Sequence, residues 1–139
     1  IFKMKKLSLL LAVVLMQFSN CSSSAQNEKN TSSNEINQVR IDVDVSEFKN
    51  KMKEKDIVIL DVRTPAETVQ GKIKGTIEID VRSSDFQEKI KKLDKDKTYL
   101  VYCRSGKRSV KACNMLEKEG FKKMYNLLGG FNAWKINSQ

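Results

Sequence analysis

The sequence predicts an α/β domain with a mainly parallel central sheet of about five strands flanked by helices. Short apolar runs of strand length alternate along the chain with segments whose apolar residues recur at helical spacing. Residues 57–60 are four consecutive aliphatic residues, as expected for a parallel strand that is covered on both faces. Strands that alternate with helices need crossover connections, which place the strands parallel in one sheet. A chain of 139 residues has room for one such domain.

Each expected element has a local signal in the sequence. Thr64 and Glu67, and again Ser84 and Gln87, have the spacing of a capping box, which satisfies free N–H groups at the start of a helix. Gly120 is expected to end a helix. The expected strands are 39–43 (at a sheet edge), 57–60, 76–79, 99–102 and 123–126. The expected helices are 46–53, a short one starting at Pro65, 84–93, one after the cysteine loop to Glu119, and 131–136.

The segment 98–109 contains the residues with the clearest chemical role. Its strand stops at Cys103, and a helix begins a few residues later. The first N–H groups of a helix have no partners and its dipole is positive there. Beside Arg104, Lys107 and Arg108, a cysteine in this place is expected to ionise below the free pKa of about 8.5. A free cysteine is often only a small buried hydrophobe, but three cations within five residues favour a reactive thiolate.

The loop from Cys103 to Arg108 resembles the active-site loop of rhodanese-like sulfurtransferases. The resemblance covers about residues 39–136, with motifs in the order found in that family. Further matching segments are 60–63 (Leu-Asp-Val-Arg), Glu67 with Gly71, Ile73 and Gly75, and 128–131 (Leu-Gly-Gly-Phe) with Trp134. The resemblance implies a rhodanese-like fold and an enzyme of the thiosulfate sulfurtransferase type.

In such an enzyme Cys103 is the catalytic nucleophile and carries sulfur as a persulfide. The loop residues would bind substrate and persulfide. Their backbone N–H groups would hold the persulfide, the three cations would orient an anionic donor, and Ser105 and Gly106 would let the loop turn tightly. The substrate- and persulfide-binding residues are therefore expected to be Arg104, Ser105, Gly106, Lys107 and Arg108.

Other strand ends are expected near this loop, because ligands of open α/β sheets bind beyond the carboxyl ends of the strands. Asp61 and Arg63 follow the strand at 57–60 and are expected to support the site as an ion pair, with direct substrate contact as the alternative. Lys72 stands where the family usually has histidine. Cys113 shares the apolar side of its helix and is expected to be a core thiol.

The loop spacing separates sulfur transfer from phosphate chemistry. Four residues lie between Cys103 and Arg108, whereas the cysteine-dependent phosphatases have five and so a wider loop. Sulfur transfer to a thiol or cyanide is therefore favoured over phosphatase or arsenate reductase activity. The alternative from another class is a non-catalytic persulfide carrier or redox-sensing module that acts on a protein partner.

Composition narrows the expected cofactors and partners. The chain has 26 Lys and Arg against 17 Asp and Glu, a formal charge of +9, which suits small anions. The basic residues are interleaved with acidic ones, so no nucleic-acid partner is expected. The sequence has no histidine, which excludes a Cys-His pair. We expect no metal, no cofactor and a monomer whose partners are a small anionic sulfur donor and a thiol acceptor.

The start of the chain has the pattern of a bacterial lipoprotein signal. Lys5 and Lys6 precede an apolar run at 7–16, which is shorter than the roughly 20 residues of a membrane span. Cys21 would be the acylated first residue after cleavage, although Asn20 departs from the small residue preferred before it. The alternative is that Cys21 is an ordinary residue of a leader removed elsewhere. We expect export to the periplasm or cell envelope with a lipid anchor to the membrane.

The residues after Cys21 are rich in Ser, Asn, Gln and Glu. Such a composition cannot bury enough apolar surface to fold, and a flexible tether is expected. The predicted organisation is a signal peptide at 1–20, a flexible polar tether at 21–38 and one rhodanese-like domain at 39–139.

Overall fold

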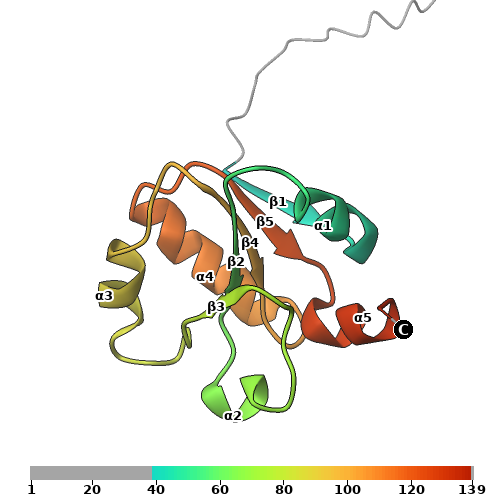
Figure 1. The fold of residues 1–139 in the computed structure, drawn as a ribbon. Coiled ribbons are helices and arrows are strands. Elements are labelled where there is room, and N and C mark those ends of the chain that lie inside the picture. The colour runs from blue at the N-terminus through green and yellow to red at the C-terminus, as the bar shows by residue number, and fades with distance from the viewer. Residues whose placement is uncertain (1–38, 139) are drawn as a thin grey trace, which may run out of the picture. The chain divides into compact units, whose positions relative to one another are not determined.

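The computed structural model describes residues 39–138, so the predicted signal peptide, the lipidation site and the tether lie outside the described residues. These residues form a five-stranded sheet in the order β1-β5-β4-β2-β3, with parallel pairing between all neighbours (Figure 1). The strands are β1 (Arg40–Val43), β2 (Ile57–Asp61), β3 (Thr76–Glu78), β4 (Thr98–Tyr102) and β5 (Met124–Leu127). The predicted parallel α/β fold is confirmed, with β1 at an edge.

Helices connect the strands. They are α1 (Val45–Lys51), α2 (Pro65–Thr68), α3 (Phe86–Lys91), α4 (Lys107–Lys118) and α5 (Gly130–Ile136). The predicted capping contact at α2 is present, because the Thr64 N–H donates to the Glu67 carboxylate at 3.1 Å. The prediction for Ser84 and Gln87 is wrong. Helix α3 starts after Asp85, and the Gln87 side chain instead donates to Glu119 at 2.8 Å.

Apolar side chains cover both faces of the sheet. Helices α3 and α4 pack on one face and α1 and α5 on the other (Figure 1). On the second face, Phe48 of α1 is fully buried and lies edge-on to Trp134 of α5, with 6.1 Å between ring centroids. Each large side chain buried in this way stabilises the fold by about 1.5–3 kcal/mol. Two-sided burial accounts for the continuous apolar runs of β2 and β4.

The parallel sheet brings distant segments together at the end where the carboxyl ends of its strands lie. Strand β4 leads into Cys103, β2 leads to Arg63, and β5 leads to the glycine pair Gly129 and Gly130 at the start of α5. Helix α2 lies at the same end of the sheet (Figure 1). Within 39–138, no helix has both the length and the apolar character needed to cross a membrane.

Candidate active site

Cys103 lies fully buried between the end of β4 and the start of α4. Its Sγ accepts a hydrogen bond from the Gly106 N–H at 3.1 Å and one from the Ser109 hydroxyl at 3.5 Å. Burial alone raises the pKa of the Cys103 thiol. Hydrogen bonds from Ser109 and from the backbone of Ser105 and Gly106 outweigh that effect and hold the pKa below its ordinary value. The site therefore favours a thiolate, which is the nucleophilic form of cysteine.

Ser109 is a candidate site residue that the sequence analysis did not identify. It is buried in the first turns of α4, and its hydroxyl also lies 2.9 Å from the Gly106 carbonyl oxygen. One hydroxyl hydrogen serves one acceptor at a time, so donation to Sγ becomes the favoured state when the sulfur is charged. A serine six residues after a loop cysteine is the signal that could have identified this role.

Replacing Ser109 with alanine is expected to raise the pKa of Cys103 and to slow its reaction at neutral pH by about 5-fold, the equivalent of about 1 kcal/mol. The measurement is the rate of iodoacetamide alkylation of Cys103 against pH. The control is Ser105→Ala, since the Ser105 side chain is exposed and only its backbone contributes at the sulfur. Superimposable pH profiles for wild type and Ser109→Ala would refute the role of the hydroxyl.

Arg63 and Asp61 form the predicted ion pair. The Arg63 Nε lies 2.9 and 3.0 Å from the two Asp61 oxygens, and Nη2 lies 2.6 Å from Oδ2. Nη2 also donates to the Gly71 carbonyl at 2.8 Å. The side chains are only 3% and 0% exposed, so removing either partner would cost about 3–5 kcal/mol. The remaining nitrogen, Nη1, has no hydrogen-bond partner among residues 39–138.

Arg108 is paired with Glu67 of α2. Its Nη1 and Nη2 donate to the two carboxylate oxygens of Glu67 at 2.7 and 2.6 Å. This paired hydrogen bonding holds the pKa of Glu67 down at about 2. Arg108 thus joins α4 to α2, with its charge compensated. The geometry favours a positioning role for this side chain over the expected direct contact with a donor.

The pairing of Glu67 with Arg108 predicts a pH-dependent contribution to stability. Because the folded pKa lies below the unfolded value, the contribution is present above about pH 4.3 and is lost as the pH falls toward 2. Glu67→Gln is expected to lower the free energy of unfolding by about 1–2 kcal/mol at pH 7, after discounting for solvent screening.

Urea denaturation at pH 7 and pH 3 tests this prediction. The difference between wild type and Glu67→Gln is expected to narrow at the lower pH. Glu88→Gln is the control, because Glu88 is 71% exposed and pairs only with Lys91 on its own helix. A difference that stays constant with pH would contradict the assignment.

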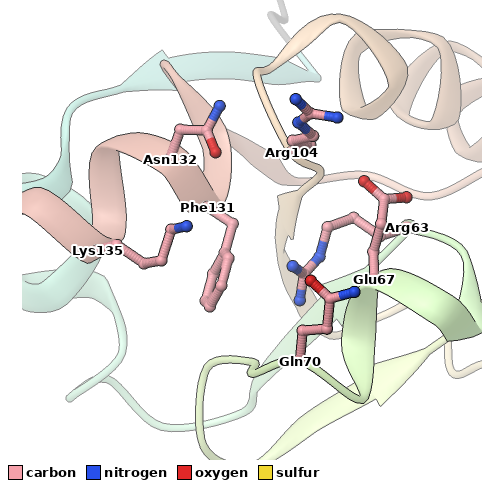
Figure 2. Close-up of a pocket in the computed structure, with 7 residues that line it drawn as sticks. All are labelled: Arg63, Glu67, Gln70, Arg104, Phe131, Asn132 and Lys135. Carbon is pink, nitrogen blue, oxygen red and sulfur yellow. The ribbon is translucent and has the colours of Figure 1, made fainter.

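A cavity of about 370 Å³ lies beside the cysteine loop (Figure 2). Cys103 is not on its wall, but the neighbouring Arg104 is. Lys107 and Arg108 are not on the wall either. The lining residues are Arg63, Glu67, Gln70, Arg104, Phe131, Asn132 and Lys135. The structure therefore places Arg63 and Arg104 on the cavity wall, but not Lys107 or Arg108.

Helix α5 fixes the loop from the other side. The Phe131 N–H donates to the Cys103 carbonyl at 2.7 Å, and the Asn132 N–H donates to the Arg104 carbonyl at 3.0 Å. The Phe131 ring also lies 4.1 Å from the Arg63 guanidinium carbon. Phe131 and Trp134 are both partly buried and pack against the core, and Phe131 also forms part of the cavity wall.

The remaining candidates lie away from the cavity. Cys113 is fully buried, and burial raises the pKa of its thiol to about 12, as suits a core thiol. Lys72 pairs with Glu78 of β3. Within the described part of the chain, no group of three or more His, Cys, Asp or Glu side chains could hold a metal ion.

A buried cysteine with a lowered pKa, held by helix-terminal donors beside a cavity that two arginines line, is the arrangement expected of an α/β enzyme with a nucleophilic cysteine. The protein-family model for the Rhodanese-like domain matches residues 44–137 of this sequence. The chain belongs to the rhodanese-like domain family.

Known proteins similar to this chain include sulfurtransferases. The putative sulfurtransferase YtwF of Bacillus subtilis is 37% identical over 95 residues, which are 68% of this chain and 89% of YtwF. The thiosulfate sulfurtransferase GlpE of Coxiella burnetii is 38% identical over 86 residues, or 62% and 78% of the two chains. A rhodanese-related protein of Thermoplasma volcanium has a TM-score of 0.60 and 32% identity over 68% of this chain and 90% of its own. These matches support sulfur transfer as the general class of activity.

Proposed function

We propose that this protein is a sulfurtransferase that moves sulfane sulfur from thiosulfate or a similar donor to a thiol or cyanide through a Cys103 persulfide. The observation that carries the proposal is the pair of hydrogen bonds on Sγ, from Gly106 at 3.1 Å and Ser109 at 3.5 Å. The Gly106 N–H is fixed by the backbone, and the Ser109 hydroxyl hydrogen can turn to a charged sulfur, so both donors stabilise a sulfur anion. They serve the thiolate and the persulfide anion alike.

In the first step, the Cys103 thiolate attacks the outer sulfur of thiosulfate. A new S–S bond forms on Cys103, the S–S bond of thiosulfate breaks, and its electron pair leaves with sulfite. Arg104 lies on the cavity wall next to Cys103 in the sequence, and Arg63 lies on the same wall, with an Nη1 that has no hydrogen-bond partner among residues 39–138. These two groups would attract and orient the anionic end of the donor.

In the second step, the acceptor attacks the outer sulfur of the persulfide. With a thiolate acceptor, its sulfur bonds to the transferred sulfur, and the electron pair of the broken bond returns to Cys103 as thiolate. The acceptor leaves as a persulfide, and no oxidant or reductant is consumed. Donor and acceptor use the site in turn, which predicts ping-pong kinetics.

The test is intact-mass analysis of the purified protein before thiosulfate, after thiosulfate and after added cyanide. The expected result is a gain of one sulfur atom, lost to cyanide, with thiocyanate released over many turnovers. A persulfide that forms but does not turn over would favour the carrier. Failure of every sulfane donor to load sulfur would refute sulfur transfer and favour a redox-sensing module.

We also propose that the protein is exported and anchored by lipid at Cys21, on the strength of Lys5, Lys6, the apolar run and the cysteine that follows it. Expression in a bacterium followed by membrane fractionation tests this. Cys21→Ser is expected to move the protein out of the membrane fraction. An unchanged distribution would refute the lipid anchor.

A further inference from the structure

The end of the sheet opposite the active site is rich in lysine. Strands β1, β2, β4 and β5 all begin there, because the first residues of neighbouring strands pair with one another or lie one residue out of step. The connections that follow α1, α3 and α4 meet at this end (Figure 1). The lysine-rich end is defined here as the last residue of each of these helices together with the connection that follows it, which gives residues 51–56, 91–97 and 118–123.

The lysine-rich end carries most of the net charge of the domain. Its three segments contain ten lysines and five acidic residues, a formal charge of +5, whereas residues 39–138 as a whole have 22 basic and 15 acidic residues, or +7. The matching segments at the other end are the strand-to-helix connections, each with the first residue of its helix. They contain four basic and three acidic residues, and they are 44–45, 62–65, 79–86, 103–107 and 128–130. The positive charge is therefore concentrated at the end away from the cavity.

Most of these lysines are not neutralised by a neighbouring acid. Three of the ten have a carboxylate within 4.0 Å, and the other seven have none in the part of the chain that the structure describes. Of the large apolar side chains that are exposed among residues 39–138, none lies in the three segments. The lysine-rich end therefore attracts an anionic surface through its charge and not by inserting apolar groups.

The chain enters the domain at the same end. Strand β1 begins at Arg40 level with the start of β5, so the residues before it join the domain beside the lysine-rich end. Cys21 precedes Val39 by 18 residues. Since a chain spans at most about 3.5 Å per residue, a lipid on Cys21 would keep this end within about 60 Å of the membrane. Such a tether gives the domain a high effective concentration at the bilayer, and a modest electrostatic attraction then suffices to orient it.

We propose that the lysine-rich end is a docking surface for an anionic lipid bilayer and that it holds the domain with the active-site cavity facing away from the membrane. Each lysine close to an anionic bilayer strengthens binding by about 5-fold. A lipid chain combined with a polybasic surface anchors a protein more firmly than either signal alone. A bilayer is favoured over other polyanions because the charge lies at the end from which the chain leads back to Cys21.

Vesicle flotation of the full chain tests the docking surface. The protein carries Cys21→Ser, so it cannot be acylated and the proposed lipid anchor does not affect the result. Binding is expected to phosphatidylcholine vesicles that contain about 30% phosphatidylglycerol, but not to phosphatidylcholine alone, at about 0.15 M salt. The combined variant Lys55→Gln, Lys92→Gln and Lys123→Gln removes one unpaired lysine from each segment. It is expected to weaken binding by about 10-fold or more and to load sulfur at the normal rate.

The control makes the same change of charge outside the lysine-rich end. It is the combined variant Lys74→Gln, Arg82→Gln and Lys111→Gln, in which all three replaced side chains are exposed. This variant is expected to bind anionic vesicles as the unchanged protein does. If both combined variants weaken binding equally, or if the unchanged protein does not bind anionic vesicles, the docking surface is refuted while the sulfurtransferase stands.

Energy transfer to a dye in the vesicle tests the orientation. A fluorophore is attached at Lys55→Cys or at Arg82→Cys in protein that also carries Cys21→Ser and Cys103→Ser; the remaining Cys113 is fully buried. Position 55 belongs to the lysine-rich end and position 82 to a connection at the other end. More transfer is expected from position 55 than from position 82. Equal transfer from the two positions would overturn the orientation, whether or not Cys103 loads sulfur in the native protein.

Discussion

Cys103→Ser is expected to abolish sulfur loading while leaving the fold intact. A serine hydroxyl is not ionised at neutral pH and no histidine is available to act as its base, so the variant has no nucleophile. The replacement exchanges sulfur for oxygen beside the same hydrogen-bond donors, and the new hydroxyl can accept the Gly106 hydrogen bond. The free energy of unfolding is therefore expected to change by about 1 kcal/mol or less. Intact mass after thiosulfate and a urea melt measure the two quantities.

Cys113→Ser is the matched control with the opposite outcome. Cys113 is buried among apolar side chains, and its pKa of about 12 keeps the thiol protonated at neutral pH. A hydroxyl there is expected to lower the free energy of unfolding by about 1–3 kcal/mol while sulfur loading stays normal. Loading of the Cys103→Ser protein at Cys113 would contradict the assignment of the nucleophile.

The fold could be predicted because its signals are local. The apolar runs of β2 and β4 and the capping contact of α2 depend on neighbouring residues, and each occurs where the sequence indicated it. Alternation with helices then predicts that the strands run parallel, which brings the carboxyl ends of β2 and β4 to the same end of the sheet. The error at Ser84 has the same origin. A capping pattern is a weak local preference, and the contact between Gln87 and Glu119 prevails over it.

The contacts that shape the site could not be predicted because they are not local. Glu67 and Arg108 are 41 residues apart, and either could have faced solvent or a substrate. The sequence likewise does not indicate that α5 returns to the cysteine loop, or that Phe131 and Lys135 line a cavity with Arg63. Those placements follow from how α2 and α5 pack beside the sheet, which residue spacing does not encode.

Gly130→Ala is expected to have the largest effect of any single methyl group added near the site. A Cβ at Gly130 would lie 2.4 Å from the Cys103 carbonyl oxygen and 2.7 Å from the Arg104 carbonyl carbon, and both are backbone atoms. Its φ of +57° adds the cost of a left-handed conformation, about 1 kcal/mol. Relief of the clash must move α5 away from the loop and break its two hydrogen bonds, from Phe131 and Asn132. We expect a loss of about 3 kcal/mol or more in the free energy of unfolding.

The same displacement is expected to slow sulfur loading by about 100-fold, because a shift of about 1 Å in a reacting group has effects of that size. Gly75→Ala separates strain from collision: Gly75 has a φ of +81° and nothing within 4 Å of an added Cβ. It is expected to cost about 1 kcal/mol and to load sulfur at the normal rate. Stopped-flow kinetics of loading and urea melts of both variants provide the comparison. If the Gly130→Ala protein loads sulfur as fast as the Gly75→Ala protein, contact with α5 does not position the cysteine loop. The hydrogen bonds on Sγ are then maintained by β4 and α4 alone.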